Sequence, residues 1–140
     1  MTQRPLRLAH LSDVHVLELQ GTPWRAFLNK RATGAVNLLG PRRGAHPTSA
    51  ADHLAGELAA RLRDGRLDHV LITGDLTNLS LESEYRAARA VVERIGSPAQ
   101  VTVIPGNHDV YTEDAAQSRA FERHFAEYVA APGDDAARDT

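Results

Sequence analysis

Three short polar stretches hold the residues of this sequence that are best suited to chemistry. They are SDVH (12–15), GDLTN (74–78) and PGNHD (105–109), and their candidate side chains are Asp13, His15, Asp75, Asn78, Asn107, His108 and Asp109. Carboxylate and amide oxygens and imidazole nitrogens are ligands for divalent metals such as Mn, Fe or Zn. A carboxylate has two oxygens, so one Asp can bridge the two ions of a two-metal hydrolytic site. The composition of the stretches therefore predicts a metal site, provided that the fold brings them together.

The elements around these stretches predict that convergence. Short runs of apolar and β-branched residues indicate strands, and apolar residues at helical spacing indicate helices. The expected strands are 6–12, 67–75 and 100–104, and the expected helices are 49–64, 80–95 and 112–129. Strands that alternate with amphipathic helices predict an α/β fold with a mainly parallel sheet. Each polar stretch lies at a strand end, and the carboxyl ends of parallel strands share one edge, so all three should meet there.

The helices carry recognisable start signals and apolar stripes. Thr48 or Ser49, Ser80 and Thr112 are the expected N-caps of the three helices, because a side-chain oxygen at that position accepts a hydrogen bond from the first turn. The expected buried residues are Leu54, Leu58 and Leu62 in the first helix, Tyr85, Ala88, Val92 and Ile95 in the second, and Ala120, Phe121, Phe125 and Tyr128 in the third.

Two glycines and one spacing should shape the polar turns. Gly74 and Gly106 allow a sharp backbone turn with positive φ and leave room for a metal or a phosphate. The D-x-H spacing of Asp13 and His15 should point both side chains to one side if the loop is extended, since alternate residues of an extended chain share a face.

The composition narrows the class of protein. The chain has 140 residues, 42% of them hydrophobic and 24% charged, which suits one globular domain. A net charge of −2 argues against a general nucleic-acid binder. There is no cysteine, so thiolate metal sites and disulfides are excluded. No apolar run is long enough to span a membrane, and the first residues lack a signal-peptide core, so we expect a cytoplasmic protein.

A basic segment at about 17–47 interrupts the alternation of strands and helices. Its cations could form a rim for an anionic substrate or contact acidic lipid head groups, although a solvated surface is the more common role of such a cluster. They are Arg25, Lys30, Arg31, Arg42 and Arg43. We expect one partial domain over residues 1–131 that includes this insertion, followed by a polar, frayed tail at 132–140.

The three polar stretches together resemble a known family. SDVH, GDLTN and PGNHD are similar to the first three motifs of the calcineurin-like metallophosphoesterases, D-x-H, G-D and G-N-H-[DE]. HLSDVH and VTVIPGNHD resemble in particular the bacterial cyclic-nucleotide-phosphodiesterase-like branch. The resemblance covers about residues 6–129 and implies the N-terminal half of an αββα sandwich.

The resemblance also implies roles for individual residues. Asp13 and His15 would bind one divalent ion, Asp75 would bridge two, and Asn107 would bind the second. His108 would hydrogen-bond a phosphate oxygen or protonate the leaving group, while a metal-bound hydroxide attacks phosphorus. Mn or Fe are the expected metals, with Zn or Mg as alternatives. The expected substrate is a small phosphate ester, with cyclic nucleotides among the options and phosphodiesters foremost.

One departure from the family pattern leads to a second hypothesis. Family members continue with a further metal-binding His and a G-H-x-H motif, whereas the only histidine after His108 is His124. The chain therefore resembles half of the fold, a fragment whose sheet would need cover from a dimer partner or from a C-terminal half. It is either part of a phosphohydrolase or a truncated, non-catalytic binding or assembly module. A nucleotide-binding domain is disfavoured, since no G-x-x-x-x-G-K-[ST] or G-x-G-x-x-G occurs at a strand–helix junction.

Several polar residues near the motifs have alternative interpretations. Asp109 could orient His108 or another ligand, or it could be a plain turn residue. Thr77 and Asn78 are expected to be hydrogen-bonding loop residues rather than ligands. Asn78 is expected to contact the residues that bind the metal without binding it itself. His10 is expected to be a packed strand histidine away from the site.

Overall fold

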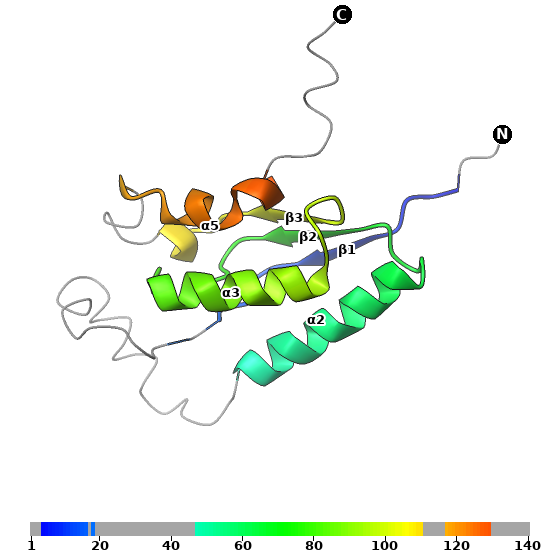
Figure 1. Ribbon diagram of the computed structural model, residues 1–140, viewed down its shortest axis with the longest axis horizontal. Helices are drawn as coiled ribbons and strands as arrows, with labels where there is room; N and C mark the ends of the chain where they lie inside the picture. The colour runs from blue at the N-terminus through cyan, green and yellow to red at the C-terminus, as the bar shows by residue number, and fades with distance from the viewer. Residues whose placement is uncertain (1–3, 17, 19–46, 111–116, 130–140) are drawn as a thin grey trace, which may run out of the picture.

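The fold is a three-stranded parallel sheet that alternates with helices, as expected for an α/β protein. The computed structural model describes residues 4–16, 18, 47–110 and 117–129. Over these residues the sheet order is β1-β2-β3, with all neighbouring strands parallel (Figure 1). In chain order the elements are β1 (Leu8–Leu11), α2 (Pro47–Arg63), β2 (His69–Thr73), α3 (Glu82–Ile95), β3 (Val101–Ile104), the 3₁₀ turn η2 (His108–Val110) and α5 (Ala120–Val129).

One face of the sheet forms the floor of the hydrophobic core. Successive strand residues point to opposite faces, and Val70 and Ile72 of β2 align with Val101 and Val103 of β3 on the inner face. All four are at most 1% exposed. The β-branched side chains explain both the strand conformation and the dense packing of this layer.

The helices pack side by side over this inner face. Figure 1 shows α3 between α2 and α5, in agreement with the contacts of α3 with both neighbours. The predicted stripes of α3 and α5 are confirmed, and so are Leu58 and Leu62 of α2. Leu54 is an exception, since it is 42% exposed.

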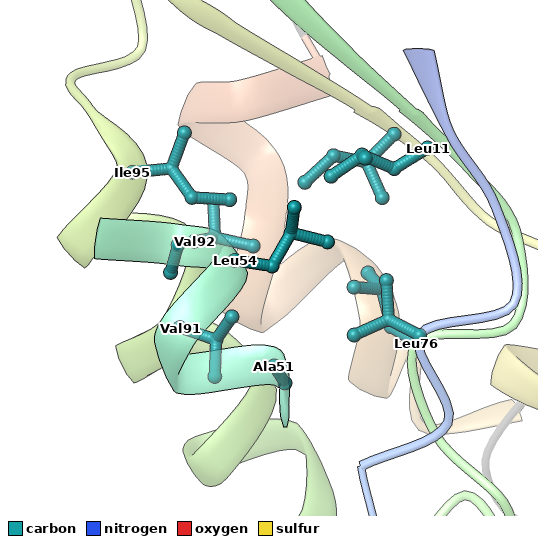
Figure 2. A pocket seen from close by; sticks show the side chains of 10 residues that line it. Leu11, Ala51, Leu54, Leu76, Val91, Val92 and Ile95 are labelled. Atoms are coloured by element: carbon teal, nitrogen blue, oxygen red, sulfur yellow. The ribbon is translucent and has the colours of Figure 1, made fainter. Parts of the chain in front are cut away.

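Leu54 lines a small apolar hollow between α2, α3 and the sheet (Figure 2). Leu11 and Ile72 contribute from the strands, and Val91 and Val92 contribute from α3. Its volume is about 10 Å³, roughly that of one water molecule, and its apolar lining offers a water no hydrogen-bond partners. The hollow is therefore a gap in the packing and is too small for a ligand.

The start of α2 differs from the sequence prediction. This helix begins at Pro47, and proline suits the first helical position because its fixed φ is already helical and its missing N–H would have no partner there. Thr48 and Ser49 therefore lie within the first turn of the helix.

The start of α3 also differs. Ser80 does not cap this helix: its φ is 53°, and its hydroxyl donates a hydrogen bond to the carbonyl oxygen of His108 at 2.5 Å. The carboxylate of Glu84 accepts the backbone N–H groups of Leu79 at 2.8 Å and Leu81 at 3.2 Å instead. Glu84 thus makes the reciprocal half of a capping box, since its side chain reaches back from the first turn to the backbone that precedes the helix.

The last helix is shorter than predicted. A turn at Ser118 and Arg119 precedes α5, and Arg119 has a φ of 50°, which no helical residue can adopt. The continuous helix expected over 112–129 is therefore wrong at this point, and the expected cap Thr112 lies outside the described residues.

The outer face of the sheet is open over the part of the chain that the structure describes. Leu8 of β1 is 56% exposed and Ile104 of β3 is 47% exposed. On the same face, a ring nitrogen of His10 lies 2.6 Å from the hydroxyl oxygen of Thr73. His10 is thus a strand residue away from the polar rim, as expected, but it is exposed instead of packed.

The remaining expectations concern the insertion, the tail and the membrane. The basic residues of the insertion and the tail at 132–140 lie outside the described residues. Among the helices that the structure describes, none combines the length and the apolar character of a membrane span.

Candidate metal centre

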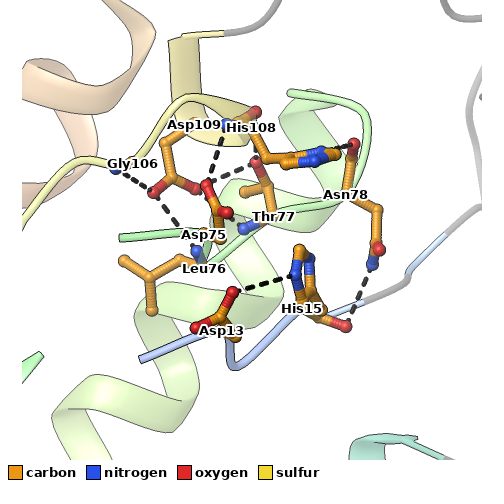
Figure 3. Close-up of polar contacts among 9 residues, drawn as sticks. All are labelled: Asp13, His15, Asp75, Leu76, Thr77, Asn78, Gly106, His108 and Asp109. Carbon is orange, nitrogen blue, oxygen red and sulfur yellow. Dashed lines mark hydrogen bonds and ion pairs between the residues drawn. The ribbon is translucent and has the colours of Figure 1, made fainter. Parts of the chain in front are cut away.

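The loops after β1 and β2 bring three predicted ligands together. One ligand atom from each of Asp13, His15 and Asp75 lies within 4.8 Å of the other two (Figure 3). Nε2 of His15 lies 3.7 Å from Oδ1 of Asp13, whose side chain is exposed. Asp13 and Asp75 are far apart in the sequence, so the parallel sheet produces this convergence as predicted.

A backbone ladder holds the two loops together beyond the ends of the strands. The N–H of Asp13 donates to the carbonyl of Gly74 at 3.2 Å, and the N–H of His15 donates to the carbonyl of Asp75 at 2.9 Å. A third bond, from Val16 to Leu76, measures 2.8 Å. The candidate ligands therefore lie on two loops that are joined to each other by backbone hydrogen bonds.

The three candidate ligands share an uncommon backbone conformation. The φ angles of Asp13, His15 and Asp75 are 57°, 47° and 53°. The left-handed region costs roughly 1–3 kcal/mol for a non-glycine residue, and such residues cluster at functional sites. The D-x-H loop is therefore not extended as expected, and its turns come from left-handed residues instead.

The loops after β2 and β3 approach closely through two glycines. Gly74 has the expected positive φ, at 82°. Gly106 has no positive φ, but a Cβ placed on it would lie 2.7 Å from Cα of Gly74 and would overlap Oδ1 and the backbone nitrogen of Asp75. Gly106 is thus required for space, and its missing side chain makes room for the carboxylate of Asp75.

His108 is held beside the ligands by its backbone and its ring. Its N–H donates to Oδ1 of Asp75 at 2.9 Å. Its Nδ1 lies 2.9 Å from the carbonyl oxygen of Asn78, and because a carbonyl only accepts, this nitrogen carries the proton. The ring of His108 meets that of His15 edge-on, with centroids 5.2 Å apart. The side chain of Asn78 donates in turn to the carbonyl of His15 at 2.9 Å, so Asn78 ties both histidine loops together.

Asp109 is more than a plain turn residue, because its carboxylate bonds to the loops that carry Asp75 and His108. It is fully buried, and its carboxylate accepts the N–H groups of Leu76 at 3.2 Å, Thr77 at 2.8 Å and Gly106 at 3.0 Å. The hydroxyl of Thr77 donates to the same carboxylate at 3.1 Å. Asp109 therefore links the loop that contains Gly74 to the loop that contains Gly106. Thr77 is a hydrogen-bonding loop residue, as expected.

Asn107 differs from the other candidate residues in its exposure and its contacts. Asn107 is exposed, and within the described residues its side chain takes no part in the contacts that join the other candidates. Its role as a ligand therefore stays a prediction.

Tyr85 is a contact of the site that the sequence does not predict. It is expected only as a core residue, yet its hydroxyl donates to the carbonyl oxygen of Asp109. Buried tyrosine hydroxyls usually find a partner, but nothing in the sequence indicates which one.

The residues present fit a divalent cation. Two carboxylates and an imidazole form a donor set typical of Mn, Fe or Zn sites. Nδ1 of His15 is buried and has no hydrogen-bond partner among the described residues. Nε2 of the same ring is the nitrogen near Asp13, at 3.7 Å, so the donor set of Asp13, His15 and Asp75 is what fits an ion at this rim.

The comparison with protein families agrees with this geometry. The family model for calcineurin-like phosphoesterases matches residues 6–137, nearly the whole chain. The chain belongs to the calcineurin-like phosphoesterase family. A search of curated proteins found no matching relative. The family predicted from the three motifs is thereby confirmed at the level of the superfamily.

Family membership also gives the site a chemical class. Calcineurin-like phosphoesterases are hydrolases of phosphoric esters that use divalent metal ions, and the Asp13–His15–Asp75 group is a candidate metal site of that kind.

Proposed function

We propose that this chain carries metal-binding and catalytic residues of a metal-dependent phosphohydrolase whose substrate is a phosphodiester. The observation that carries the proposal is the meeting of Asp13, His15 and Asp75 within 4.8 Å of one another at the rim where His108 also lies. The family match supports the reaction class, and the local resemblance of HLSDVH and VTVIPGNHD to cyclic-nucleotide phosphodiesterases supports a small phosphodiester.

We assign the donors to two cations, as the family resemblance implies. Asp13 and His15 would hold one ion, Asp75 would lie between the two, and the exposed Asn107 would face the second. Divalent cations held there would supply Lewis-acid charge for the phosphoryl oxygens and a nucleophile at neutral pH. Mn or Fe fits the mixed oxygen and nitrogen donors best, with Zn or Mg as alternatives.

His108 is suited to move a proton or to bind a phosphoryl oxygen. Its Nδ1–H is used by the carbonyl of Asn78, so proton exchange at this ring takes place at Nε2. The bond from its N–H to Asp75 keeps the ring close to the candidate ligands. A general acid placed in this way typically contributes 10²–10⁴-fold to a rate, by protonating the oxygen that leaves.

The test is hydrolysis of bis(p-nitrophenyl) phosphate with Mn²⁺ after removal of other metals with a chelator. We expect Asp75→Asn to lower kcat/KM at least about 100-fold, because the carboxylate that would hold the cations is removed, and with it the positive charge that stabilises the transition state. Asp64→Asn is the matched control, since the carboxylate of Asp64 pairs with Arg66 on the surface, at 2.8 Å. Equal activity of the two variants, or an Mn²⁺-independent wild type, would refute the proposal.

A second candidate function is a non-catalytic binding or assembly module. The exposed apolar side chains of the outer sheet face, Leu8 and Ile104, favour it. It predicts a dimer or a stable partner. A chain that is monomeric by sedimentation and hydrolyses the diester would exclude it.

A further inference from the structure

A tyrosine in the core is linked to the metal centre through two successive hydrogen bonds. Tyr85 of α3 donates its hydroxyl to the backbone carbonyl of Asp109. The carboxylate of that same Asp109 accepts the N–H groups of Thr77, at 2.8 Å, and Gly106, at 3.0 Å. Thr77 and Gly106 belong to the two loops that position Asp75 and His108, so the tyrosine acts on both loops at once.

The position of Tyr85 is itself tightly defined. The side chain is 1% exposed, and its ring is stacked on that of His124 of α5, with centroids 5.4 Å apart and an interplanar angle of 10°. A ring nitrogen of His124 lies 2.8 Å from the carboxylate of Glu82, at the start of α3. The ring of Tyr85 is therefore held in place between α3 and α5. Its hydroxyl consequently has a fixed position from which to bond to Asp109.

We propose that Tyr85 is a positioning residue of the metal centre. Its hydroxyl fixes the backbone of Asp109, so that the carboxylate holds the two glycine loops at the spacing that Asp75 requires. The proposal rests on the proposed metal centre and assigns to α3 a function beyond packing. Groups that orient metal ligands from outside typically change metal affinity 10–100-fold when they are removed.

The chain offers a closely matched control. Tyr128 of α5 is also buried, at 3% exposed, and its hydroxyl also donates to a backbone carbonyl, that of Gly96, at 3.2 Å. Gly96 follows the far end of α3, whereas Tyr85 lies near its start. Tyr85→Phe and Tyr128→Phe thus each delete one buried hydroxyl from the same helix pair, and only the first is connected to the loops.

The first measurement is Mn²⁺ binding by calorimetry, together with thermal denaturation. We expect Tyr85→Phe to weaken Mn²⁺ binding about tenfold, which corresponds to about 1.4 kcal/mol, and Tyr128→Phe to change it less than about twofold, although both lower Tm by similar amounts. Equal Mn²⁺ affinities of the two variants would overturn the proposal, because the hydroxyl would then contribute only to stability.

A second measurement needs no metal. Amide hydrogen exchange at Thr77 and Gly106 should be several-fold faster in Tyr85→Phe than in Tyr128→Phe, because the carboxylate that accepts these N–H groups is less firmly held. Equal exchange at both amides would overturn the positioning role. A wild type that binds no Mn²⁺ would instead count against the metal centre, and the exchange comparison would still decide whether Tyr85 fixes the loops.

Discussion

The close approach of two loops at Gly106 leads to the sharpest prediction about this site. In Gly106→Ala the added Cβ would lie 2.7 Å from Cα of Gly74, where ordinary contact begins at 3.4 Å, and it would overlap Oδ1 and the backbone nitrogen of Asp75. Two of these three atoms are backbone, and the carboxylate oxygen is already held by the N–H of His108 at 2.9 Å. No flexible side chain can move aside, so the loops must part.

The size of the effect follows from that geometry. Overpacking of a well-packed region costs about 1–3 kcal/mol, and a clash with backbone belongs at the upper end. For a chain of this length about 3 kcal/mol lowers Tm by roughly 9 °C. Because the carboxylate of Asp75 moves with its loop, we also expect Mn²⁺ affinity to fall about 10–100-fold.

Two other glycines provide controls for the same substitution. Gly56 lies inside α2, and a Cβ there meets nothing within 4 Å, so Gly56→Ala should raise stability by up to about 1 kcal/mol through helix propensity. Gly65 also has open space but a φ of +66°, so Gly65→Ala should lose about 1–2 kcal/mol from backbone strain. Neither change should alter Mn²⁺ affinity.

Thermal denaturation and Mn²⁺ calorimetry of the three variants test whether the close approach of the two loops positions Asp75. If Gly106→Ala melted and bound Mn²⁺ as Gly56→Ala does, the two loops would not be in the close contact described, and Asp75 would have to be positioned in some other way. If it lost stability but kept its affinity, the spacing of the loops would not determine the ligand geometry.

Two further predictions concern stability. The backbone N–H of Arg7, and then the guanidinium groups of Arg4 and Arg7, hold the pKa of Asp68 below its ordinary value. The stabilisation is therefore complete at neutral pH and is lost as the pH falls below about 4 and through the lowered pKa. The difference in urea stability between wild type and Asp68→Asn should thus be full at pH 7 and shrink as the pH is lowered below about 4; a difference that stays constant would contradict this. Phe125 is 0% exposed, so Phe125→Ala should lose about 3–5 kcal/mol in urea denaturation, whereas Val129→Ala, at a position 45% exposed, should lose far less; similar losses would mean that α5 is not docked.

Much of the fold follows from local patterns that tertiary contacts do not override. The strands around Val70 and Val101 are short β-branched runs, and the stripe that contains Val92 has helical spacing, so element types and core residues are readable from the chain. The exact ends of the helices are harder to predict from the sequence. Ser80 was a plausible cap, but its hydroxyl donates instead to the carbonyl of His108, which is a contact between distant segments.

The grouping of Asp13, His15 and Asp75 is readable from the amino-acid sequence alone, because polar residues that follow parallel strands must share one edge of the sheet. The way in which these residues are held is a property of the tertiary structure. The left-handed backbone of all three, the burial of Asp109 and the reach of Tyr85 depend on the distance between loops that are remote in the chain. Local propensity carries no information about that distance.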